Sequence, residues 1–70
     1  MNEAQRTAHF VAIILSEIRR KPALDDAAFQ KIVSNDIVIP ELVKNYGYFH
    51  MFGYDQVIRE LSQKEPLLAL

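Results

Sequence analysis

The sequence predicts an all-α fold, a small bundle of three to four short helices that forms one domain over residues 1–70. Two observations predict it. Apolar residues recur three and four positions apart, and capping residues together with proline and glycine divide the chain into short segments. One run of β-branched residues, 37–39, would suit an extended segment, but no partner strand accompanies it.

The clearest element is a helix over about 3–20. Asn2 and Gln5 have the spacing of a capping box, in which each side chain accepts a hydrogen bond from the backbone N–H of the other residue. The basic residues 19–21 favour the C-terminal end of a helix, and Pro22 ends it. At 100° per residue, the predicted apolar face comprises Ala4, Thr7, Ala8, Val11, Ile14, Leu15 and Ile18.

Phe10 and Ile13 lie outside that face, so the first helix is apolar around much of its circumference. Either other helices of the chain cover both sides, or the second side meets another copy. Small domains without disulfides often gain stability by oligomerising. We therefore expect a homodimer, with an interface that comprises Phe10, Ile13, Ile14 and Glu17.

A second helix is predicted over about 26–34. Asp25 is a good N-cap, and Asp26 suits the positive end of the helix dipole. Leu24 and Phe29 stand at the two positions of a hydrophobic staple. Polar residues then end the helix.

The third helix is predicted to begin at Pro40, because the missing N–H of proline costs least in a first turn. Residues 37–39 are then an apolar linker or part of that turn. The helix spans about 40–46, or 40–52 if it continues through Gly47.

A last helix is predicted over about 56–64, with Asp55 as its N-cap after Gly53. The chain then ends in an apolar tail, residues 67–70. This tail either packs across the first helix or stays exposed as a candidate surface.

Composition narrows the function classes. The 70 residues are 50% hydrophobic, contain no cysteine and carry a formal net charge of −1. A disulfide scaffold and a thiolate metal site are therefore excluded, and nucleic-acid binding is disfavoured. His9 and His50 are far apart in the sequence, and no serine has an evident base, so we expect no catalytic, cofactor or metal site. The N-terminus does not resemble a signal peptide and no stretch suits a membrane span, so a cytoplasmic protein is expected.

The segment 46–54 is unusually aromatic and contains no formally charged residue. Protein interfaces favour tyrosine, phenylalanine, methionine and arginine. We therefore predict a protein-binding surface made of Tyr46, Tyr48, His50, Phe52 and Tyr54, with Arg19 and Arg20 steering an acidic partner. The alternative is that Tyr46, Phe49 and Phe52 belong to the core.

The function predicted from these patterns is a small interaction module, a stoichiometric inhibitor or adaptor of the phage, mobile-element or regulatory accessory type, that occludes a surface of a larger protein. One alternative is a helix-turn-helix regulator, in which helices 26–34 and 40–46 present Lys44 and Asn45 to DNA. Another is a structural subunit of a larger assembly.

Overall fold

A computed structural model describes residues 1–69, and these form helices and connecting turns without any strand. The predicted all-α bundle is therefore confirmed. The elements, in chain order, are α1 (Glu3–Arg19), α2 (Asp26–Ser34), α3 (Val38–Lys44), α4 (Tyr46–Phe49), α5 (Tyr54–Leu61) and the 3₁₀ helix η1 (Pro66–Ala69).

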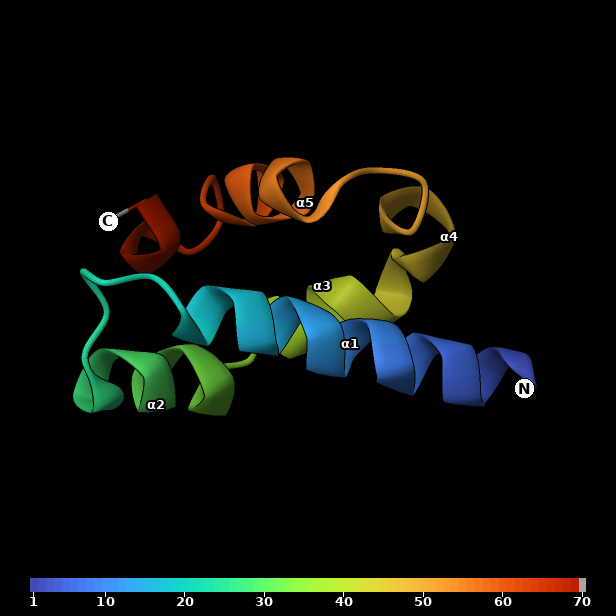
Figure 1. Ribbon diagram of the computed structural model, residues 1–70, viewed down its shortest axis with the longest axis horizontal. Helices are drawn as coiled ribbons and strands as arrows, with labels where there is room; N and C mark the ends of the chain where they lie inside the picture. The colour runs from blue at the N-terminus through green and yellow to red at the C-terminus, as the bar shows by residue number, and fades with distance from the viewer. Residues whose placement is uncertain (70) are drawn as a thin grey trace.

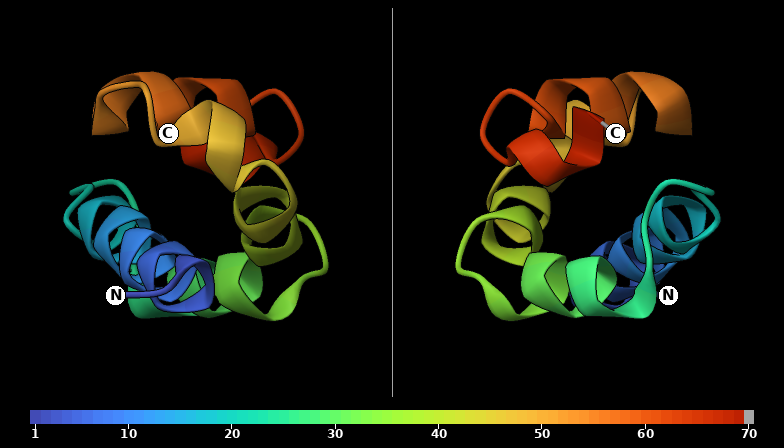
Figure 2. Two further views of the ribbon diagram at one scale, coloured as in Figure 1. Left: turned by 90° about the vertical axis from the view of Figure 1, so that its right-hand side faces the viewer. Right: turned by 90° about the vertical axis from the view of Figure 1, so that its left-hand side faces the viewer.

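The helices surround a single core (Figure 2). The longest helix, α1, runs along the molecule and packs against α3 and α5, while α2 packs against α3. Figure 1 shows α5 and η1 lying together across from α1 and α2, with α4 at the turn that leads to α5. The N-terminal turns of α1 extend beyond the other helices.

The core draws on every helix of the described chain. Burying one large aliphatic side chain contributes roughly 1.5–3 kcal/mol, so this cluster is the main source of stability. Its largest fully buried side chains are Ile14, Ile18, Ile32, Val38, Leu42, Val57, Leu61 and Leu68.

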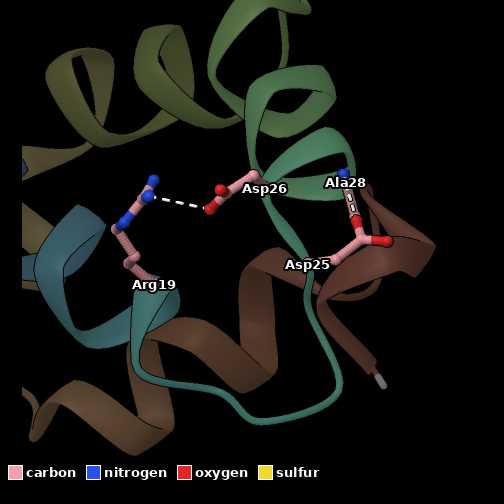
Figure 3. A network of polar contacts seen from close by, with 4 residues as sticks. All are labelled: Arg19, Asp25, Asp26 and Ala28. Atoms are coloured by element: carbon pink, nitrogen blue, oxygen red, sulfur yellow. Dashed lines mark hydrogen bonds and ion pairs between the residues drawn. The ribbon is translucent and has the colours of Figure 1, made fainter.

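The first two helix starts follow the prediction. Asn2 Oδ1 accepts from the Gln5 N–H at 2.8 Å, and Gln5 Oε1 accepts from the Asn2 N–H at 3.0 Å, so the capping box is present. Asp25 caps α2 by accepting from the Ala28 N–H at 2.8 Å (Figure 3). Helix α2 has the predicted bounds, and α1 ends one residue earlier than predicted.

The third predicted helix is divided, and a continuous helix over 40–52 is wrong. Helix α3 begins at Val38, so residues 38 and 39 form its first turn, one of the two predictions for this stretch, and Val38 is fully buried in the core. The break falls at Asn45, which has φ −110° and ψ 25°, rather than at Gly47. The Asn45 amide donates to the Glu41 carboxylate at 2.9 Å, and Gly47 lies inside α4.

The last helix is also displaced. Gly53, in an extended conformation, precedes the first residue of α5, so the prediction of Asp55 as N-cap is wrong. Asp55 lies in the first turn, where its charge suits the helix dipole. The helix ends at Leu61, and the tail turns back as η1, which packs against α5 and buries Leu68.

The buried face of α1 differs from the predicted face at its N-terminal end. Ile14 and Ile18 are fully buried, but Ala4 and Ala8 are exposed and Phe10 enters the core instead. The reason is that the first turns of α1 extend past their neighbours (Figure 1). Ala4 and Ala8 line an open groove with the exposed Val43 of α3.

Candidate partner-binding surface

A shallow hollow opens between the N-terminal half of α1, helix α4 and the first residue of α5. Its volume is about 260 Å³. We call it the aromatic hollow, and it is lined by Met1, Arg6, His9, Phe10, Ile13, Tyr46, His50 and Tyr54.

The aromatic hollow joins two surfaces that the sequence analysis treats separately. The predicted partner-binding residues Tyr46, His50 and Tyr54 form its α4 and α5 side. Phe10 and Ile13, assigned to the predicted dimer interface, form its α1 side. The fold therefore places side chains more than 30 residues apart in sequence around one depression.

Stacked rings give the floor of the hollow a defined shape. The Phe10 and Tyr46 rings meet edge to face, with centroids 5.5 Å apart. The Tyr46 ring stacks on His50 at 5.0 Å, with 22° between the planes. Such aromatic pairs contribute roughly 0.5–1.5 kcal/mol beyond their buried area, so the floor is held in place before any partner arrives.

A backbone contact orients His50. Its Nδ1 lies 2.9 Å from the carbonyl oxygen of Tyr46, one helical turn earlier. A carbonyl oxygen only accepts, so Nδ1 carries a proton in this geometry. Nε2 is then the ring nitrogen that is left to meet a partner.

The rim of the hollow is basic. Arg6 and His9 are exposed and lie three residues apart on α1, on neighbouring positions of one helix face. His50 approaches from α4, and no aspartate or glutamate lines the hollow. Across residues 1–69, neither Arg6 nor His9 forms a salt bridge. The hollow therefore combines an aromatic floor with the positive charge of Arg6, which is unpaired within residues 1–69.

No protein-family model, curated protein or solved structure matches this chain. None of the helices in residues 1–69 has the length and apolar character that a membrane-spanning segment needs. In the same part of the chain, no three histidine, aspartate or glutamate side chains gather as metal ligands would.

Tyr48 and Phe52, also predicted to bind a partner, lie outside the aromatic hollow. The Tyr48 hydroxyl donates to Glu60 Oε1 at 2.9 Å, which ties α4 to α5. The Phe52 ring meets the Tyr48 ring edge to face at 4.9 Å. The hydrogen bond to Glu60, with the negative charge of that carboxylate, raises the pKa of Tyr48. Tyr48 also lines a separate polar depression, together with Glu41, Glu60 and Lys64.

Arg19 and Arg20 also lie away from the hollow. Thirteen residues separate Arg19 from Arg6, which is about 20 Å along a helix. The Arg19 guanidinium pairs with Asp26 at 2.8 Å (Figure 3) and lies over the Phe29 ring, 4.7 Å from its centroid. Arg20 lies 3.3 Å from Glu17. Arg19 thus joins α1 to α2, and Arg20 pairs within the last turn of α1.

The residues predicted for a dimer interface are divided between core and surface. Ile14 is fully buried, and only 8% of Phe10 is exposed, so both pack within the chain. Ile13 and Glu17 are partly exposed. A second copy on this face could therefore meet Ile13 and Glu17, while Ile14 lies out of its reach.

Sequence reasoning missed Arg6 and His9 as members of the candidate site. With Phe10 and Ile13 they form a stripe at spacings of three and four residues, so their common face was visible in the sequence. Nothing in the sequence showed that α4 would lie beside this stripe.

Proposed function

We propose that this protein is a small, non-enzymatic interaction module that binds a larger protein and occludes part of its surface, as a stoichiometric inhibitor or adaptor. The observation that supports this best is the aromatic hollow. Interface cores are enriched in tyrosine, phenylalanine and arginine, and binding energy concentrates where such rings form a pocket. The composition without cysteine suits a reducing compartment, and we propose that it acts in the cytoplasm.

Exposed apolar side chains in the hollow and beyond it also support a partner. Val43 is 53% exposed, Met51 68% and Tyr54 42%. Tyr54 belongs to the hollow, and Val43 lines the groove on the other side of α1. A partner that covers the hollow would bury Tyr54, and one that also wraps around α1 would bury Val43.

The helix-turn-helix alternative has less support from the geometry. Helix α3, the proposed recognition helix, has seven residues and buries Val38 and Leu42. Its Glu41 pairs with Lys64 of the C-terminal segment at 3.0 Å. Lys44 is the one basic residue of the helix. Phosphate contacts normally dominate affinity for DNA, so a gel shift at low salt separates the two proposals.

A structural subunit would use the same exposed surface. The isolated chain would then be insoluble, and co-expression with one partner would make it soluble. That result would favour a subunit over an inhibitor or adaptor. The predicted homodimer is compatible with either role, and sedimentation at micromolar concentration tests it.

The decisive experiment uses two tyrosines as a matched pair. Tyr54 lies in the hollow and Tyr48 outside it, with 42% and 47% of each exposed. The tagged protein and its Tyr54→Ala and Tyr48→Ala variants are used to capture partners from the source organism, with quantitative mass spectrometry.

We expect one protein to be recovered in near-stoichiometric amount with the parent chain and with Tyr48→Ala, and to be lost with Tyr54→Ala. Circular dichroism checks that the variants are folded. Equal recovery with both variants would remove the hollow as the binding surface. Loss with Tyr48→Ala alone would move the surface to the α4–α5 side.

A further inference from the structure

We propose that the aromatic hollow binds an acidic polypeptide segment. A bulky apolar side chain of the segment would rest on the Phe10 and Tyr46 rings, and a flanking carboxylate would pair with Arg6. This inference rests on the proposed function and specifies the chemistry of the partner.

The charge distribution is the first reason. The chain has nine acidic and eight basic residues, so a surface with basic groups alone does not follow from its composition. Elsewhere the carboxylates of Glu17, Asp26 and Glu41 each pair with a basic side chain. Arg6 and His9 have no such partner within residues 1–69.

The nearby carboxylates do not change this result. Glu3 lies one turn before Arg6 and lines the groove with Ala4 and Val43, and it forms no salt bridge with Arg6. Asp55 follows Tyr54 in α5 and is not among the lining residues of the hollow. The lining of the hollow therefore contains the positive charge of Arg6 and no carboxylate.

The size of the hollow is the second reason. Its volume of about 260 Å³ is below the roughly 300–1,000 Å³ of typical small-molecule sites. It suits one large side chain with the backbone of a peptide passing over it. The planar guanidinium of Arg6 can then bond a carboxylate through two N–H groups, which adds both energy and orientation.

The same charges disfavour a second copy as the occupant. In a two-fold dimer the same patch serves both subunits. Pairing hollow to hollow would bring the rim with Arg6 against an identical rim, and like charges at an interface are repulsive. The positive charge on the rim attracts an acidic partner, whereas it repels a second copy of the same rim.

The test uses the full chain and three synthetic peptides. Each is an acetylated, amidated pentapeptide with a central phenylalanine, flanked on both sides by two glutamates, two serines or two lysines. Two-dimensional NMR spectra follow the backbone and ring resonances during titration. The variant is Arg6→Gln, and the matched control is Arg59→Gln, at an exposed arginine of α5 outside the hollow.

We expect the glutamate peptide to shift resonances of Phe10, Tyr46, His50 and Tyr54 and to bind at least tenfold more tightly than the lysine peptide. Arg6→Gln should weaken binding of the glutamate peptide at least threefold, and Arg59→Gln should leave its affinity unchanged. Raising the salt concentration should weaken it as well, since exposed charges are screened.

Three results would overturn the proposal: equal binding of the three peptides, no effect of Arg6→Gln, or shifts located away from the hollow. A dimer in sedimentation that Tyr54→Ala abolishes would also overturn it, by making a second copy the occupant.

Failure here is distinct from failure of the proposed function. If capture of a cellular partner depends on Tyr54 but the glutamate peptide does not bind, the proposed interaction module is supported and the proposed acidic segment is refuted. If the glutamate peptide binds as expected and no cellular protein is recovered, the chemistry of the hollow stands and the inhibitor or adaptor role is refuted.

Discussion

Asn35 and Glu65 join two parts of the chain that are 30 residues apart. The Asn35 side-chain amide donates to the Glu65 carboxylate, and Asn35 Oδ1 accepts from the Ile37 N–H at 3.1 Å. The other Glu65 oxygen accepts from the Leu67 N–H at 3.2 Å, and only 7% of Glu65 is exposed. One pair of side chains thus connects the α2–α3 turn to η1.

Replacing Glu65 with alanine should lower the free energy of unfolding by about 1–3 kcal/mol, because the Asn35 amide and the Leu67 N–H both lose a partly buried acceptor. Urea denaturation measures the loss. Gln63→Ala, at an exposed position two residues away, is the control and should change stability by less than about 0.5 kcal/mol. Equal losses would show that the pair contributes little.

The adjacent Asp25 and Asp26 should differ in their effect on stability. Asp25 caps α2 through the Ala28 N–H, and loss of an N-cap typically costs about 1 kcal/mol. Asp26 pairs with Arg19 while its side chain is 90% exposed, and such surface pairs contribute about 0–1 kcal/mol. Asp25→Ala should therefore lower the thermal midpoint more than Asp26→Ala. The reverse order would contradict the assigned roles in Figure 3.

Two neighbouring isoleucines of α1 separate core from surface. Ile14→Ala should cost about 2–5 kcal/mol, because the fully buried side chain leaves a cavity. Ile13→Ala should cost about 1 kcal/mol or less, since Ile13 lies at the edge of the hollow. Chemical denaturation of both variants checks this. A larger cost at Ile13, together with a dependence on protein concentration, would instead support the predicted homodimer.

Tyr48 should ionise at a higher pH than an ordinary tyrosine. Its hydrogen bond to Glu60 raises its pKa, above the ordinary value of about 10. The neutral phenol is the form that the fold stabilises, so this contribution is present below pH ~10 and is lost as the pH rises through the raised pKa. A pH titration that follows tyrosinate absorbance should therefore include a transition above pH ~10, which belongs to Tyr48.

Glu60→Gln should lower the pKa of Tyr48 toward the ordinary tyrosine value, because the negative charge beside the phenol is removed. Glu3→Gln, at an exposed glutamate of α1, is the control and should leave it in place. A Tyr48 pKa that Glu60→Gln leaves unchanged would contradict the charge of Glu60 as a cause, since the glutamine oxygen can still accept the hydrogen bond.

Local chemistry explains the parts of the fold that sequence reasoning predicted. The caps at Asn2 and Asp25 use backbone N–H groups three residues away, so the information that starts α1 and α2 is contained in a few neighbouring residues. Acidic first turns and the stop at Pro22 are equally local. These signals determined the all-α class and the bounds of the first two helices.

The tertiary structure alone decided which apolar side chains would be covered. Ile14 and Ala4 lie on the same predicted face of α1, yet only Ile14 is buried, because the neighbouring helices reach one part of that face. The aromatic hollow depends in the same way on α4 lying beside Phe10. Burial and shared surfaces arise from contacts between residues distant in sequence, and helical periodicity describes one helix at a time.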